Sequence, residues 1–347
     1  MSGTYSGDLN QLLADGDVVA IVATQRLRPV DGPGAPFFPP TYLGSNDRPT
    51  YCISPTGDGK NLCTVDSVQS QANRVEAAFM EEPYRPLVRR VEVTAKLPND
   101  GSRTLDMLQL GHRLADAAVA FSTLAEQANA AMRSFATGPE EIAKLSPMSL
   151  LCGLWESRGE SGQLKIPRAF SASITARNVR ELRRMATFTG SFWSKDLGLE
   201  GTRSTEGLDP VPAGEALGGV IAEGEIVRTS ILNLVALRQN CKVHPGKLAS
   251  AAGQYVFGLG VVAMTMQPET FLRQGCLLVA DGESPLNVIT RGGQERSLEL
   301  SHTDALGFAQ AAAAAFGVSG LQPISAVFQT EKVEKPKAAK DKPARGK

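Results

Sequence analysis

Hydrophobic and polar positions divide this chain into short buried segments separated by polar stretches. Residues 17–24 (DVVAIVAT) are rich in β-branched side chains, which predicts a buried strand. Residues 248–268 contain no charged side chain. Their length would suit a membrane span, but Ser250, Gln254 and three glycines favour a buried helix of a packed protein.

The same patterns predict the remaining elements. Strands are expected at residues 89–95, 149–157, 170–176, 275–281 and 325–329. Helices are expected at residues 66–82, 105–135, 178–186, 225–239, 248–266 and 303–316. Strands and helices are mixed without a regular alternation, which predicts an α+β fold.

Three segments interrupt this pattern. Residues 29–62 and 195–224 are rich in proline, glycine and polar residues, and we interpret them as two long insertions. Residues 331–347 carry seven Lys or Arg against three acids and almost no apolar bulk, which predicts a disordered basic tail. The domain is therefore expected to span residues 1–330.

The helix at residues 66–82 carries the most distinctive polar face. Val68, Ala72, Val75 and Phe79 recur at helical spacing and predict one buried stripe. Asp66 is placed to cap the helix, with Gln69 as its capping-box partner. The opposite face presents Ser67, Gln69, Ser70, Asn73 and Arg74 near the helix N-terminus, where backbone N–H groups favour a phosphate. From the residues alone, a well-capped surface helix with a polar face is the favoured interpretation.

A second feature is a local excess of positive charge. The whole chain has a net charge of zero, yet residues 158–195 contain eight basic residues and two acidic ones. The predicted ligands in it are Lys165, Arg168, Arg177, Arg180, Arg183 and Arg184. Arginine suits phosphate recognition, and Phe188, Phe192 and Trp193 are available to stack on bases. A solvated basic surface over core aromatics is the alternative.

Composition argues against several other classes of protein. The five cysteines have no C-x-x-C spacing, and the three histidines lie far apart, which disfavours a disulfide framework and a metal site and fits a cytoplasmic protein. No Walker loop, G-x-S-x-G or H-E-x-x-H motif occurs. The glycines of GLGVVA at residues 258–263 are better explained by close helix packing than by dinucleotide binding. We expect no cofactor, no membrane association and no catalytic residue, with His112 the one weak candidate.

Several motifs resemble a known family. The string DSVQSQANR at residues 66–74, the string LSPMSLLCGLWES at residues 145–157, its continuation KIPRAF at residues 165–170 and the early Arg26 and Arg28 occur in the family's order. They resemble the CRISPR-associated RAMP superfamily, specifically the backbone subunit of type I-G (formerly I-U) Cascade complexes.

The resemblance implies an RRM-like (ferredoxin-like) palm with inserted finger and thumb elements. It implies a non-catalytic subunit, several copies of which bind side by side on one CRISPR guide RNA and present guide bases to a target DNA strand. Its other partners would be the large subunit of Cascade and the RAMP subunit that caps the guide 5′ end. Arg26 and Arg28 would line the same groove as the polar helix face, and Trp155 would be either a ligand or a core residue. The alternative is a RAMP-type, metal-independent endoribonuclease of repeat RNA, and a third possibility is a subunit that contacts only protein.

Overall fold

A computed structural model of the chain describes residues 4–5, 8–44, 47–157, 163–188, 192–201 and 203–333, with the side chains of 186–188 and 211–215 excepted. The largest sheet has the strand order β14-β15-β1-β13-β10-β5-β4, and β16 pairs with β1 while β17 pairs with β16. These strands span Phe271–Arg273, Cys276–Ala280, Val18–Pro29, Ile226–Asn233, Phe170–Arg177, Asn61–Asp66, Ile53–Pro55, Leu286–Thr290 and Glu295–Leu298. Smaller sheets contain β2 (Thr41–Leu43), β3 (Pro49–Tyr51), β6 (Val91–Lys96), β7 (Ser102–Asp106), β8 (Leu154–Trp155), β9 (Lys165–Ile166), β11 (Val179–Phe188), β12 (Val211–Ala222) and β18 (Ile324–Val327).

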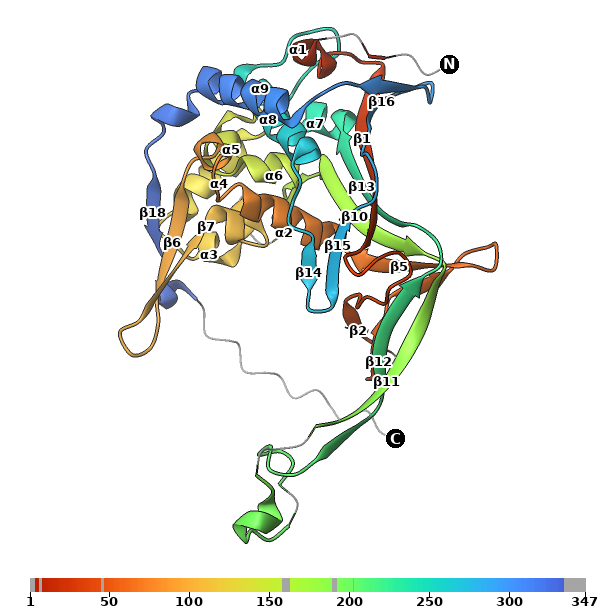
Figure 1. Cartoon of the computed structure of the whole chain (residues 1–347). Helices are drawn as coiled ribbons and strands as arrows, with labels where there is room; N and C mark the ends of the chain where they lie inside the picture. The colour runs from red at the N-terminus through yellow and green to blue at the C-terminus, as the bar shows by residue number, and fades with distance from the viewer. Residues whose placement is uncertain are drawn as a thin grey trace, which may run out of the picture.

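The centre of the large sheet has ferredoxin-like topology. Its strands β15 or β16, β1, β13 and β10 lie side by side and are antiparallel throughout. Helix α2 (Val68–Ala78) lies between β1 and β10 in sequence, and α8 (Ala251–Thr265) follows β13. This is a β-α-β-β-α-β order with both helices on one face (Figure 1). The predicted α+β, RRM-like fold is confirmed.

The remaining helices lie on the same side of the large sheet as α2 and α8 (Figure 1). They are α1 (Leu9–Leu12), α3 (Ala117–Ala120), α4 (Ala125–Ser134), α5 (Glu140–Leu145), α6 (Pro147–Leu151), α7 (Leu234–Asn240) and α9 (His302–Phe316). Helix α7 packs on β1 and β13, and α9 packs on α8. Helix α8 is buried along most of its length, as predicted. Gly258 permits its approach to α9, because an added Cβ would lie 3.0 Å from Ala309 Cα. Among the described residues, no helix is long and apolar enough to cross a membrane.

An arm projects from the sheet between β10 and β13 (Figure 1). It consists of the antiparallel strands β11 and β12, so the helix predicted at residues 178–186 is wrong. Its base is fixed by Asn61, whose side chain accepts from Val179 N at 2.7 Å and donates to Val179 O at 2.9 Å. The predicted insertion at residues 195–224 therefore contains a short 3₁₀ turn and the returning strand of this arm.

Other expectations need correction. Residues 147–151 form α6, so only the end of the expected strand at residues 149–157 is extended. The helix expected at residues 225–239 begins as β13 and becomes helical only in α7. The helix expected at residues 105–135 is divided into short turns, α3 and α4. The expected loop at residues 29–62 contains β2, β3 and β4. Residues 334–347 of the predicted tail lie outside the described residues.

Candidate nucleic-acid interface

Helix α2 follows strand β5 of the large sheet directly, and it presents the predicted polar face. Ser67 caps it by accepting from Ser70 N at 3.2 Å, so the cap predicted at Asp66 is wrong. Asp66 instead lies on β5, where its carboxylate accepts hydrogen bonds from the side chains of Gln71, Arg74 and Arg273. Ala72, Val75 and Phe79 are fully buried, which confirms most of the predicted stripe. Val68 is only partly buried.

The exposed face of α2 meets a second predicted motif, about 100 residues further along the chain. Gln69 Nε2 donates to Asn73 Oδ1 at 2.9 Å, one helical turn away. Arg168 Nη2 donates to Gln69 Oε1 at 3.3 Å, and Arg168 Nε donates to Cys152 O at 3.3 Å. These contacts hold a guanidinium beside the two amides while Arg168 stays exposed. Two motifs that only the family resemblance connected therefore form one surface.

This surface borders a cavity of about 510 Å³, which we call the motif groove. Its polar and aromatic lining comprises Gln69, Asn73, His112, Arg113, Trp155, Lys165 and Arg168. Trp155 is 69% exposed and pairs across strands with Lys165, so its core interpretation is wrong. An exposed indole beside unpaired cations is a typical platform for stacking a base. The sequence signal for it was weak, because a single tryptophan in an apolar segment more often belongs to the core.

A buried ion pair supports the floor of the motif groove. Arg113 Nε and Nη2 donate to the two Glu76 carboxylate oxygens at 2.7 and 2.8 Å. Arg113 Nη1 also donates to Gly153 O at 3.3 Å, which connects the pair to the segment before Trp155. Burial raises the pKa of Glu76, and the neighbouring Arg113 guanidinium acts in the opposite direction. Sequence analysis did not identify this pair.

Lys165 and Arg168 differ from most of the other predicted arginines in their charge partners. Among the described residues, neither has a carboxylate within ion-pair distance. Five other predicted ligands do: the pairs are Arg26–Glu225 at 3.0 Å, Arg28–Asp281 at 3.9 Å, Arg74–Asp66 at 3.1 Å, Arg180–Glu223 at 3.4 Å and Arg183–Glu181 at 2.7 Å. The Arg26 and Arg28 pairs line a separate cavity, so the structure does not bring them into the motif groove.

A second basic cavity lies at the base of the arm. It measures about 880 Å³ and is lined by Arg48, Arg183, Arg184 and Arg273, with Phe38 and Tyr51 among its aromatic walls. The Arg184 guanidinium lies 5.6 Å from the Phe38 ring centroid, within the range of a cation–π contact. Arg48 and Arg273 were not identified from the sequence. Arg183 and Arg184 thus line a different cavity from Gln69 and Asn73 of α2.

The remaining predicted ligands are dispersed. Arg177 is exposed at the end of β10, and Ser67 and Ser70 are partly buried at the start of α2. Phe192 is 67% exposed, and Lys195 Nζ lies 4.3 Å from the Trp193 ring centroid. The side chain of Phe188 lies outside the described residues.

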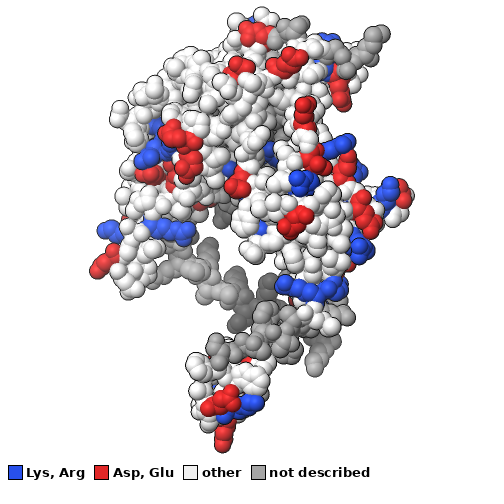
Figure 2. Space-filling view, viewed as in Figure 1, with Lys and Arg blue, Asp and Glu red and all other residues white. Residues whose placement is uncertain are grey.

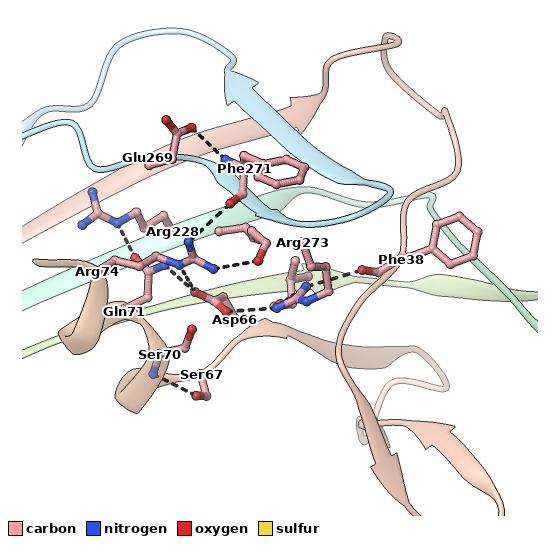
Figure 3. A network of polar contacts seen from close by, with 12 residues as sticks. Phe38, Asp66, Ser67, Ser70, Gln71, Arg74, Arg228, Glu269, Phe271 and Arg273 are labelled. Atoms are coloured by element: carbon pink, nitrogen blue, oxygen red, sulfur yellow. Dashed lines mark hydrogen bonds and ion pairs between the residues drawn. The ribbon is translucent and has the colours of Figure 1, made fainter. Parts of the chain in front are cut away.

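Arg74 occupies an internal network (Figure 3). Its guanidinium donates to Asp66 Oδ2 at 3.1 Å and to the carbonyls of Phe271 and Leu272 at 3.3 and 2.9 Å. These bonds fasten α2 to the β14–β15 hairpin. The predicted RNA contact of Arg74 stays a prediction, and the structure adds a role in positioning the helix.

Charge and sheet composition narrow the possible modes of binding. Figure 2 shows basic and acidic side chains interspersed on the face in view, rather than one continuous basic stripe. On the large sheet, Thr24, Thr229 and Ser173 form one cross-strand row. A row of short hydroxyl side chains provides no aromatic platform of the RRM type. The motif groove is therefore the stronger candidate for contact with nucleic acid.

Residues 21–181 match the family described as CRISPR-associated protein GSU0053. This match supports the assignment of the chain as a CRISPR-associated protein. The matched region includes α2, Trp155, Lys165 and Arg168, and it ends within the first strand of the arm. No curated protein matches the chain.

Proposed function

We propose that this protein binds CRISPR guide RNA independently of sequence, as the repeated backbone subunit of a type I-G Cascade complex. The observation that carries the proposal is the motif groove. It combines the amides of Gln69 and Asn73 with two cations that lack carboxylate partners among the described residues, Lys165 and Arg168. Such groups contact phosphates and sugars, which a subunit that accepts any guide sequence requires.

Trp155 extends this proposal to the bases. Its exposed ring lies beside Lys165, so a base can stack on the indole while the adjacent phosphate contacts the ammonium group. Stacking tolerates all four bases, because each has a π face. The groove would then position a short RNA segment without reading its sequence.

The test is RNA binding by a variant with Lys165→Ala and Arg168→Ala, measured over a range of salt concentrations. The slope of log K against log salt is negative, and each lost phosphate contact should make it less steep by about 0.7. Two lost contacts should therefore make it less steep by about 1.4. The matched control replaces Arg133 and Lys144, which form surface ion pairs on α4 and α5. Equal slopes for the two variants would rule out the groove as the RNA site.

Assembly with other copies is the second part of the proposal. Several copies would lie along one guide RNA, beside the large subunit and the RAMP subunit at the guide 5′ end, and the guide would pair with a target DNA strand. Purified protein should then carry RNA, detected by absorbance at 260 nm. Particle mass should increase in steps as the RNA is lengthened. A protein that purifies free of RNA from cells containing guide RNA would argue for contacts with protein alone.

Cleavage of repeat RNA is the alternative, and one observation favours testing it. The exposed His112 lines the motif groove beside Arg113 and Lys165, where a bound phosphodiester would lie. A metal-independent ribonuclease needs a general base within reach of the 2′-hydroxyl. We expect no cleavage when the protein is incubated with labelled repeat RNA. Reproducible cleavage that His112→Ala abolishes would establish the enzymatic function instead.

A further inference from the structure

The network around Asp66 contains more positive than negative charge (Figure 3). Its single carboxylate is 1% exposed and accepts hydrogen bonds from Arg74, Arg273 and Gln71. Gln71 connects this network to Arg228, because its side-chain oxygen accepts a hydrogen bond from Arg228 Nε at 2.9 Å. Two guanidinium groups therefore bond directly to one buried carboxylate, and a third, that of Arg228, is connected to it only through Gln71.

Arg228 is the member of this network without charge compensation. It lies on β13 and is 5% exposed, yet no ion pair to it exists within the described residues. Its Nη2 atom is buried and has no hydrogen-bond partner in the part of the chain that the structure describes. Glu269, drawn in the same view, accepts from Phe271 N at 3.0 Å. Burial of a cation without an anion is costly, and loss of solvation lowers the pKa of Arg228 to about 10.

Arg228 is one of the residues that line a cavity of about 210 Å³. Its lining includes Gln25, Arg228, Ser230, Thr265, Gln267 and His302. His302 places its two ring nitrogens 2.8 Å from the Tyr84 hydroxyl and 3.0 Å from the Thr265 hydroxyl. Burial lowers the pKa of His302, so the imidazole is neutral near pH 7 and Arg228 supplies the positive charge. The cavity thus combines one uncompensated cation with neutral amide and hydroxyl groups.

We propose that this cavity binds a phosphate-type oxyanion, which completes the charge balance of Arg228. Guanidinium groups bind phosphate oxygens with paired, charge-assisted hydrogen bonds. Arg228 lines the cavity, and a movement of its side chain toward the cavity would let the buried Nη2 atom donate one of these bonds. The serine, threonine and glutamine groups that line the cavity supply further hydrogen bonds. The oxyanion is either a free phosphate or a phosphate of a polynucleotide. The free-phosphate form does not depend on the RNA-binding proposal.

Titration of the whole protein with inorganic phosphate tests the site directly. Isothermal titration calorimetry should give a saturable single-site isotherm, and millimolar phosphate should raise Tm relative to chloride at equal ionic strength. Arg228→Met should lose the isotherm and the Tm rise, whereas the surface control Arg133→Met should keep both. A Tm rise of the same size in both variants would identify a general salt effect and overturn the proposal. Absence of an isotherm with the wild-type protein would overturn binding of free phosphate.

Two further measurements separate the remaining outcomes. If a polynucleotide supplies the oxyanion, Arg228→Met weakens RNA binding at least tenfold, and inorganic phosphate competes with RNA. If neither happens and the wild-type protein shows no phosphate isotherm, the proposal fails completely. In phosphate-free buffer, Arg228→Met should lose less stability than Arg113→Met, whose arginine has a buried carboxylate partner. Equal losses would show that Arg228 is already compensated within the protein.

Discussion

Removal of Arg113 should expose the energetic cost of the ion pair beneath the motif groove. In Arg113→Met, the Glu76 carboxylate remains buried and loses two hydrogen bonds of 2.7 and 2.8 Å. The side chains are only 6% and 2% exposed, so water cannot replace the lost partner. We expect a loss of about 3–5 kcal/mol in the free energy of unfolding. That is a large part of the total stability of about 5–15 kcal/mol typical of a native domain.

The assay is urea denaturation, in which the midpoint should fall while the m-value stays constant. The double variant with Glu76→Met and Arg113→Met should recover most of the loss, because no unpaired charge remains buried. Arg133→Met breaks the exposed pair with Glu126 and should cost about 1 kcal/mol or less. A loss below about 1 kcal/mol for Arg113→Met would refute the claim that the pair is desolvated.

The pH dependence of Arg113→Met gives an independent measurement. The pKa of Glu76 is already raised above its ordinary value of 4.5 by burial. Loss of the guanidinium raises the pKa further, so the folded variant holds its proton more tightly than the unfolded chain. The variant's loss in free energy of unfolding, relative to the wild-type protein, should be small below pH 4.5. It should grow as the pH rises through the pKa of Glu76 in the folded variant, by about 1.4 kcal/mol for each unit by which that pKa is raised further.

Three further changes test other parts of the structure. Trp155→Ala should weaken RNA binding by about 1–3 kcal/mol with little change in Tm, whereas an equal loss of Tm would indicate a structural role. Arg74→Ala should cost about 2–3 kcal/mol, because two hydrogen bonds to the β14–β15 hairpin and one to Asp66 are lost, and faster amide hydrogen exchange in that hairpin should accompany the loss. At pH 8, a thiol reagent should label the exposed Cys52 rapidly and spare Cys152 and Cys241, whose pKa values burial raises to about 12; rapid labelling of all three would contradict their burial.

The elements that could be predicted from the sequence are those whose pattern is fixed by burial in the core. Helix α8 is surrounded by protein, and its uncharged sequence shows this directly. Helix α2 has a buried stripe at helical spacing that ends at Phe79. The helix predicted at residues 178–186, which form strand β11, was wrong because burial in the core does not fix the pattern there. The glutamate, leucine and arginines of β11 favour a helix, but pairing with β12 determines its conformation outside the main core.

The candidate site was only partly accessible from sequence. Gln69, Asn73, Lys165 and Arg168 were identified, but only the resemblance linked them, because no local pattern shows that α2 and β9 are neighbours. Asp66 illustrates a different limit. A carboxylate before a helix predicts a cap, and its contacts with Arg273 depend on a strand that lies about 200 residues away. The number of basic and acidic residues in a segment of sequence also does not show which arginines have carboxylate partners in the folded protein.

The continuity of the arm with the sheet has a mechanical consequence. Strand β10 continues into β11, and β12 continues into β13, with only a few residues between them. Tension on the arm along its length would therefore pass into two interior strands, which are held by β5 on one side and β1 on the other. The backbone hydrogen bonds between these strands would be loaded together in shear rather than opened one after another. The arm is therefore attached to β10 and β13, two strands that are hydrogen-bonded on both sides and resist being pulled out of the sheet.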